Sequence, residues 1–295
     1  MTLKRFAAGA LTLAFAATGL VACGSNDTAA NGSGDTITIG TTDASKKAWT
    51  VFKQKADAAG IDINVQNFSD YQTPNRALDE GQLDVNLFQH IKFLAEYNVG
   101  ANSTLTPIAS TEIVPLALFW KDHKSIDEIE KGAEVAIPND PSNQGRAINV
   151  LVQAKLLKLK KDGLLTPTPA DIDQAASKVK VVPVDAAQTP AAYGEGKLAV
   201  INNSFLDRAG IDPNTSIFAD DPKSQEAEPY INVFVTKADR ADDAEIQKLA
   251  KLWHDPEVLA AVAEDSKGTS VPVDRPKEEL QQILDRVEKQ QKEQK

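Results

Sequence analysis

The residues best suited to bind a small anion lie between Ile137 and Arg146. The string Ile-Pro-Asn-Asp-Pro-Ser-Asn-Gln-Gly-Arg ends a predicted strand, and Asn139, Asp140 and Ser142 can each cap the helix that follows. The N–H groups at a helix start attract negative charge, and the guanidinium of Arg146 can hold a carboxylate through two parallel hydrogen bonds. The spacing alone also allows a capped helix with Arg146 in a surface ion pair.

A second group of residues combines aromatic rings with amides near the ends of predicted strands. It comprises Asn67-Phe68-Ser69-Asp70-Tyr71, Pro74-Asn75 and Asp84-Val85-Asn86-Leu87-Phe88-Gln89-His90. Aromatic faces can pack around a polarizable thioether, and amides can bond an ammonium or a carboxylate. The alternative is a set of core aromatics with turn-capping Asn and Asp side chains. For His90 a structural role is the simpler interpretation, because no partner stands at metal-ligand spacing from it.

The remaining composition excludes several function classes. The 295 residues contain one Cys and three His, with no Gly-x-Ser-x-Gly string and no zinc motif. The formal charge of −10 argues against a non-specific nucleic-acid binder, which needs a basic surface. We therefore expect a protein that is not an enzyme, needs no cofactor or metal, and has no nucleic-acid partner.

Residues 1–22 have the layout of a secretory signal peptide, with a basic start and an apolar run too short to span a bilayer comfortably. The run ends in Leu20-Val21-Ala22-Cys23, which resembles a bacterial lipobox, so we expect Cys23 to carry acyl chains such as palmitate. A buried core cysteine behind an ordinary signal peptide is the alternative. Residues 23–34 then form the lipidated end and a flexible tether. The predicted location is the extracytoplasmic face of the cell membrane.

Strands alternate with helices from residue 35 onward, which predicts an α/β protein with parallel sheets covered on both faces. Predicted strands lie at 36–40, 62–68, 84–88, 134–137, 179–184, 198–202 and 231–236, and a further apolar run lies at 113–120. A long helix is expected at 142–161, and an amphipathic helix at 277–295 that packs on a lobe through Leu280, Ile283, Leu284 and Val287.

The chain is long enough for two such sheets facing one ligand cleft. The apolar runs 113–120 and 231–236 are the candidate crossings between them. We therefore expect one lobe from residues 35–115 and 237–295, and a second lobe from residues 116–236.

Four blocks, in order over about 170 residues, resemble the NlpA/MetQ family of methionine-binding lipoproteins. They are the aromatic-amide strings from Phe68 to His90, Val135–Arg146, Ala199–Asn202 and Pro229–Thr236. The resemblance implies a two-lobed, type II-like periplasmic-binding-protein fold, and a monomer that delivers L-methionine, and D-methionine as a further option, to an ABC importer permease. Residues 41–49 fit the family only loosely, and Trp120 has no counterpart.

The resemblance also implies roles for individual residues. Arg146 would clamp the ligand carboxylate, while Asn202 and Asn232 would hold its amino and carboxylate groups. The side-chain pocket would be walled by Tyr71, Phe88 and His90. Phe68 and Asn86 match as well, with ligand contact and a supporting role equally open, and Trp49 faces either ligand or core. Other receptors remain alternatives, for another small apolar amino acid or a methionine-containing dipeptide, as does an extracytoplasmic enzyme.

Overall fold

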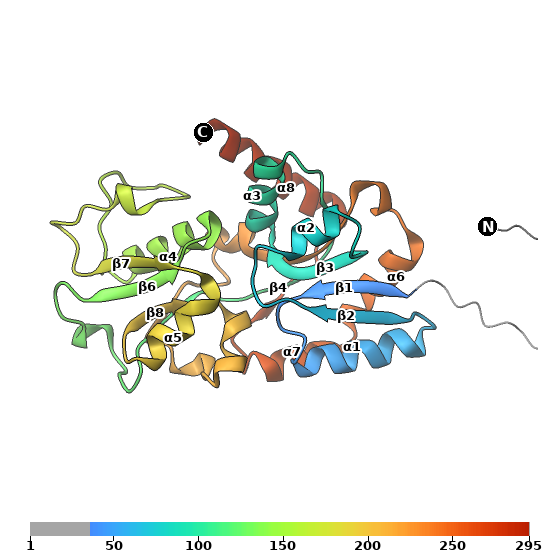
Figure 1. The fold of residues 1–295 in the computed structure, drawn as a ribbon, viewed down its shortest axis with the longest axis horizontal. Helices are drawn as coiled ribbons and strands as arrows, with labels where there is room; N and C mark the ends of the chain where they lie inside the picture. Colours follow the sequence, from blue (N-terminus) through green and yellow to red (C-terminus); the bar gives the residue numbers. More distant parts are fainter. Residues whose placement is uncertain (1–35, 295) are drawn as a thin grey trace, which may run out of the picture. The chain divides into compact units, whose positions relative to one another are not determined.

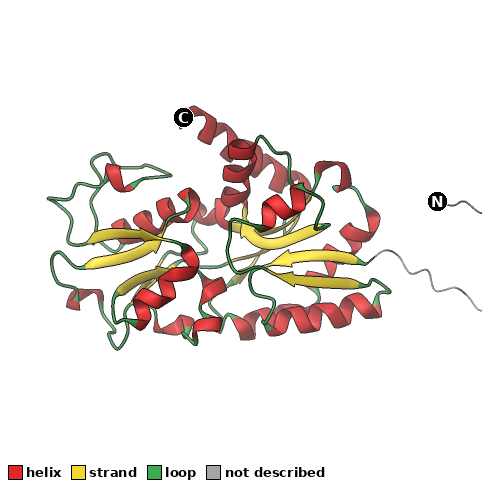
Figure 2. Cartoon of the chain, in the orientation of Figure 1, coloured by secondary structure: helices red, strands yellow, loops and turns green. Residues whose placement is uncertain are grey.

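Two separate β-sheets organise residues 36–294, the part of the chain that this computed structural model describes (Figure 2). Helices pack against both sheets, so the expected two-lobed α/β fold is confirmed. The predicted signal peptide, Cys23 and the tether lie outside the described residues. Within residues 36–294, no helix is both long and apolar enough to cross a bilayer.

The first sheet has six strands in the order β11-β4-β10-β3-β1-β2. β1 pairs in parallel with β2 and β3, whereas β10 runs antiparallel to β3 and β4, and β11 antiparallel to β4. The sheet is therefore mixed, and the expectation of a wholly parallel sheet was wrong. Its strands are β1 (Ile37–Thr41), β2 (Ile63–Asn67), β3 (Val85–His90), β4 (Thr106–Ile113), β10 (Ile231–Thr236) and β11 (Val271–Pro272).

The second sheet has five strands in the order β7-β6-β8-β5-β9. β6 is parallel to both β7 and β8, and β5 is antiparallel to β8 and β9. The carboxyl ends of β6 and β8 therefore meet at one edge, where a ligand site is expected. The strands are β5 (Ala117–Phe119), β6 (Glu134–Pro138), β7 (Lys180–Val184), β8 (Leu198–Ile201) and β9 (Phe218–Ala219).

Eight α-helices lie within residues 36–294 and pack around the sheets; Figure 1 labels them. They are α1 (Lys47–Ala58), α2 (Pro74–Asp79), α3 (Ile91–Ala101), α4 (Pro141–Gln153), α5 (Thr189–Gly194), α6 (Ala244–Lys251), α7 (Pro256–Asp265) and α8 (Lys277–Gln294). On the first sheet, α1, α6 and α7 share one core, while α2, α3 and α8 share the core of the other face.

Alternation along β10 explains how one strand serves two cores. Val233 and Val235 join the core under α3 and α8, whereas Phe234 points to the opposite face and joins the core under α1. Side chains of successive strand residues point to opposite faces, so a continuous apolar run is what a strand covered on both sides requires.

Three expectations can be compared directly with the structure. The strand 231–236 lies in the first sheet, so the expected lobe boundary at residue 236 was too late, and the return crossing lies between β9 and β10. The expected helix over 142–161 ends at Gln153, because Lys155 adopts a left-handed conformation with φ of 59°. The apolar stripe of α8 is buried against the first lobe, as predicted.

Phe52 is the side chain on which the α1 face of the first lobe depends. It is fully buried, with its ring 5.1 Å from Trp253, 5.8 Å from Trp49 and 5.9 Å from Phe234. Phe52→Ala should lower the free energy of unfolding by about 3–5 kcal/mol through lost packing and a residual cavity. Urea denaturation measures this change. Val182→Ala, at an exposed strand position, should change it by less than about 0.5 kcal/mol, and equal losses would contradict the assignment.

Candidate functional site

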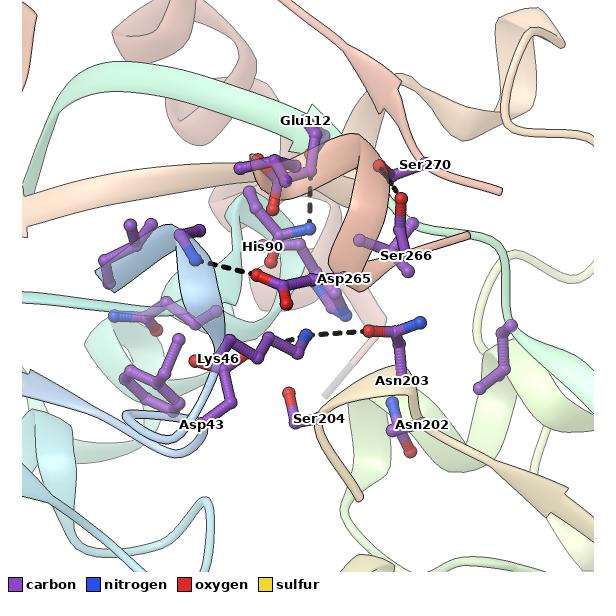
Figure 3. A pocket seen from close by; sticks show the side chains of 18 of the residues that line it. Asp43, Lys46, His90, Glu112, Asn202, Asn203, Ser204, Asp265, Ser266 and Ser270 are labelled. Atoms are coloured by element: carbon purple, nitrogen blue, oxygen red, sulfur yellow. Dashed lines mark hydrogen bonds and ion pairs between the residues drawn. The ribbon is translucent and has the colours of Figure 1, made fainter. Parts of the chain in front are cut away.

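A cavity of about 940 Å³, part of it open to solvent, is lined by residues of both lobes. The first lobe contributes the start of α1, the end of β3, β10 and the end of α7. The second lobe contributes the start of α4 and the segment after β8. Figure 3 shows His90 and Asp265 of the first lobe and residues 202–204 of the second lobe around one space.

Arg146, on the second turn of α4, is held rigidly at this cavity. It is only 4% exposed, and its Nε donates to Asp220 Oδ2 at 2.7 Å. Its Nη2 donates to Asp220 Oδ1 at 3.2 Å and to the Val114 carbonyl at 2.9 Å, and the guanidinium lies 4.0 Å from the centre of the Tyr230 ring. Among residues 36–294, nothing accepts a hydrogen bond from Nη1. The ion pair considered from the sequence therefore exists, but it is buried and leaves one edge of the fork available.

A chain of amides runs from α4 to the segment after β8. Asp140 caps α4 by accepting from the backbone N–H of Asn143 at 2.9 Å, and also from its Nδ2 at 2.9 Å. Asn143 Oδ1 in turn accepts from Asn202 Nδ2 at 2.9 Å. Asn202 Oδ1 is buried with no hydrogen-bond partner in the described part of the chain. An unpaired buried acceptor costs free energy, so this oxygen is well placed for a donor from a ligand.

His90 joins the two lobes and is held in one tautomer. Its Nδ1 accepts from the backbone N–H of Phe93 at 3.1 Å, so the proton lies on Nε2, which donates to Asn143 Oδ1 at 3.4 Å. Burial, reinforced by the charge of Arg146, lowers the pKa of His90 to about 3. The ring is therefore neutral at physiological pH and serves as a flat polar wall.

Tyr71, Phe88 and Phe93 form an aromatic wall on another side of the cavity, and Phe205 packs against Tyr71 without lining the cavity. The Tyr71 ring lies 6.0 Å from Phe88, 5.9 Å from Phe93 and 4.8 Å from Phe205. Phe205 belongs to the second lobe, whereas the other three belong to the first. Burial raises the pKa of Tyr71, so its hydroxyl stays protonated. The wall can surround a small apolar side chain.

Sequence reasoning missed a charged group that also lines the cavity, made of Asp43, Lys46, Glu112 and Asp265 (Figure 3). Lys46 Nζ lies 2.9 Å from Asp43 Oδ2, and it donates across the cleft to Asn203 Oδ1 at 2.9 Å. Burial opposes the charge on Lys46, but Asp43 outweighs it, and the pKa of Lys46 is raised. Burial raises the pKa of Glu112, which accepts from Trp253 Nε1 at 3.4 Å. Asp43 and Lys46 are three residues apart, but Glu112 and Asp265 lie far from them in the chain, so no local pattern reveals the whole group.

The structure places the other predicted residues as follows. Asn232 lines the cavity and donates from Nδ2 to the Glu112 carbonyl at 3.2 Å. Phe68 lies in the core beside Leu83 and Asn86 bonds Asn75 at 3.0 Å, so both support the walls and neither lines the cavity. Trp49 lines the cavity and also packs in the core.

Trp120 lies away from this site. It donates to the Gly196 carbonyl at 3.1 Å and stacks on His123 with ring centres 3.4 Å apart. No group of three or more His, Cys, Asp or Glu side chains among residues 36–294 is arranged to hold a metal ion.

The sequence of residues 37–274 matches the profile of a family described as NlpA lipoprotein. The chain belongs to the NlpA lipoprotein family. The match covers both lobes, including every cavity-lining residue named above.

Known proteins and solved structures are similar to this chain over most of their length. The D-methionine-binding lipoprotein MetQ of Escherichia coli K12 is 33% identical over 274 residues, 91% of this chain and 97% of that one. The substrate binding protein of a methionine transporter from Streptococcus pneumoniae is 30% identical with a TM-score of 0.75, covering 81% of this chain and 95% of that one. A nutrient binding protein from Burkholderia cenocepacia bound to methionine is 31% identical with a TM-score of 0.73, covering 80% and 99%.

The neutral state of His90 has a measurable consequence for stability. The unfolded chain binds a proton at His90 below about pH 6.5, whereas the folded chain does so only near pH 3. The free energy of unfolding should therefore fall by about 1.4 kcal/mol per pH unit as the pH drops below 6.5. His90→Gln lacks this dependence. Between pH 7.5 and pH 5, the stability of wild type relative to His90→Gln should fall by about 2 kcal/mol in urea titrations; a constant difference would contradict the buried neutral ring.

Proposed function

We propose that this chain is the extracytoplasmic receptor of an ABC importer, and that it binds L-methionine in the cavity and delivers it to the permease. The observation that carries the proposal is one cavity that joins an arginine fork with a free edge to an aromatic wall. The names of the family's relatives, which include a D-methionine-binding lipoprotein and a methionine transporter's binding protein, support the same ligand class.

In the proposed complex the ligand carboxylate takes the free Nη1 edge of Arg146. The ammonium donates to Asn202 Oδ1, a buried acceptor without a hydrogen-bond partner among residues 36–294, and Asn232 completes the polar end. The side chain then lies against Tyr71, Phe88 and His90, whose faces suit a polarizable thioether. D-methionine differs from L-methionine only in the configuration at Cα. Its affinity therefore tests how strictly the polar residues of the cavity require one arrangement of carboxylate, ammonium and side chain.

The two lobes already touch around the cavity, which supports a mechanism based on cleft closure. Lys46 donates to Asn203, Arg208 Nη2 donates to the Thr42 carbonyl at 3.2 Å, and Tyr71 packs on Phe205. A ligand that contacts both lobes binds this closed arrangement better than an open one and shifts the population toward it. The permease would then distinguish loaded from empty receptor by the relative position of the lobes.

The proposal includes the expectations for residues outside 36–294. Lipidated Cys23 would hold the protein at the extracytoplasmic face of the cell membrane, and the segment up to residue 34 would let it reach the permease. The protein would act as a monomer without a cofactor. An extracytoplasmic enzyme is the competing function class, and turnover of amino acids or peptides by residues 24–295, followed by mass spectrometry, would favour it.

Replacing Arg146 tests the ligand site. Arg146→Lys retains the charge but loses the planar fork, so methionine affinity should fall roughly 10–100-fold, equivalent to about 1.5–3 kcal/mol. Calorimetric titration of refolded, ligand-free residues 24–295 measures the affinity. The double variant Arg146→Met/Asp220→Asn removes both buried charges and should bind as weakly without leaving an unpaired carboxylate.

A matched control is available on α8. Arg286 also pairs with a carboxylate, that of Glu228, but lies outside the cavity lining. Arg286→Lys should bind methionine like wild type. Wild-type affinity in Arg146→Lys and in the double variant would overturn the site assignment, and heat with another amino acid alone would overturn methionine while keeping the receptor class.

A methionine-containing dipeptide is the second candidate, favoured by the buried carboxyl group of Glu112 in the same cavity. A dipeptide extends further than an amino acid, and its terminal ammonium would find a carboxylate there. Glu112→Gln should then weaken glycyl-methionine or methionyl-glycine at least tenfold while leaving methionine unchanged. Equal affinities of wild type and Glu112→Gln for both dipeptides would remove this candidate.

A further inference from the structure

A second cavity lies on the other side of Arg146. It encloses about 1110 Å³, part of it open to solvent, and is lined by both lobes: α3, α8 and residues 227–230 on one side, α4 and residues 163–166 on the other. Arg146 and Tyr230 are in contact, and Arg146 lines both cavities. The lining is largely apolar, with Val150, Leu164, Leu165, Ala227, Pro229 and Val287.

Lys92 places a positive charge in this apolar setting. It is 5% exposed, and its Nζ donates to the Leu165 carbonyl at 2.9 Å and to the Tyr230 hydroxyl at 3.5 Å, both neutral oxygens. Burial lowers the pKa of Lys92 to about 8, although the charge of Glu96 on the same helix opposes this shift. The ammonium is therefore still mostly protonated at neutral pH, and a charge desolvated to this degree is stabilised by an anionic partner.

One polar atom at this cavity has no hydrogen-bond partner in the described part of the chain. Gln291, on α8, is only 9% exposed, and its Oε1 has no hydrogen-bond partner within residues 36–294. Rotating the Gln291 side-chain amide by 180° would exchange Oε1 for the NH₂ group, which is a hydrogen-bond donor. Leu165, by contrast, is 55% exposed, an unusual position for a large apolar side chain beside a cavity. The cavity thus combines a desolvated ammonium and an unpaired amide oxygen with apolar surface that a ligand could cover.

We propose that this cavity is a second binding site, for an aliphatic monocarboxylate of medium chain length. The carboxylate pairs with the Lys92 ammonium, and the chain lies along the apolar lining. The exposed carboxylates Asp221 and Glu226 also line the cavity and disfavour ligands with several negative charges, such as phosphates. This site is separate from the proposed amino-acid site and does not depend on methionine being its ligand.

Octanoate is a suitable probe for calorimetric titration of the full chain. It should bind, whereas octanol, which lacks the charge, and acetate, which lacks the chain, should bind at least tenfold more weakly. Lys92→Met keeps an apolar side chain of similar length and should weaken octanoate at least tenfold. Lys248→Met is the matched control, because Lys248 also donates to a carbonyl, that of Ala59, far from the cavity; it should bind octanoate like wild type.

A second variant guards against misfolding of Lys92→Met. Leu165→Asp changes an exposed side chain and places a competing carboxylate near the ammonium, so it should also weaken octanoate at least tenfold. Methionine titration of each variant reports separately on the first cavity and should be unchanged. The proposal is overturned if octanoate gives no heat, if either variant binds it as tightly as wild type, or if saturating methionine displaces it one for one.

Discussion

The buried ion pair between Arg146 and Asp220 is the interaction on which the cavity depends. Two charges away from water are costly unless geometry and further hydrogen bonds compensate. Here the fork is bidentate, the Val114 carbonyl takes another guanidinium N–H, and Asp220 Oδ1 also accepts from the Leu116 backbone at 2.9 Å. These contacts tie α4 to both segments that cross between the lobes, because Val114–Leu116 leads out of the first lobe and Asp220 begins the return. The pair therefore fixes the point about which the lobes meet.

The walls of the cavity follow from this fixed point. Asp140, Asn143 and Asn202 form a line of hydrogen bonds from the α4 start to the segment after β8, and His90 reaches the same amide from the first lobe. Among residues 36–294, the side-chain atoms of this network that are buried without a hydrogen-bond partner are Asn202 Oδ1 and Asp140 Oδ2. Satisfied buried networks are rigid, so ligand specificity can rest on a few atoms while the aromatic wall supplies contact area.

The sequence predicted what local patterns encode and missed what depends on distant pairing. The helix start near Asp140, the place of Arg146 in the first two turns of that helix and the buried stripe of α8 follow from caps and periodicity within a few residues. The antiparallel insertion of β10 between β3 and β4 does not, because an apolar run fits either sheet. Asp220 and Glu112 were missed for the same reason: each acquires its role from a partner more than 60 residues away. Asn143 was within reach, since it lies one helical turn before Arg146.

The order of β10, β11 and α8 in the chain has a consequence for how the protein reaches its folded state. The second lobe is one continuous stretch from β5 to β9, so its sheet can assemble without the rest of the chain. The first lobe is divided: β10 is a central strand of its sheet, and α8 completes one of its cores, yet both arrive at the end. If the chain is translocated N-terminus first, β1 to β4 emerge well before β10 and α8. The first lobe therefore stays incomplete until the end of the chain has been translocated. The early strands of the first lobe have unpaired edges during that interval. The C-terminal fifth of the chain, from β10 onward, therefore decides whether a translocated chain folds or aggregates.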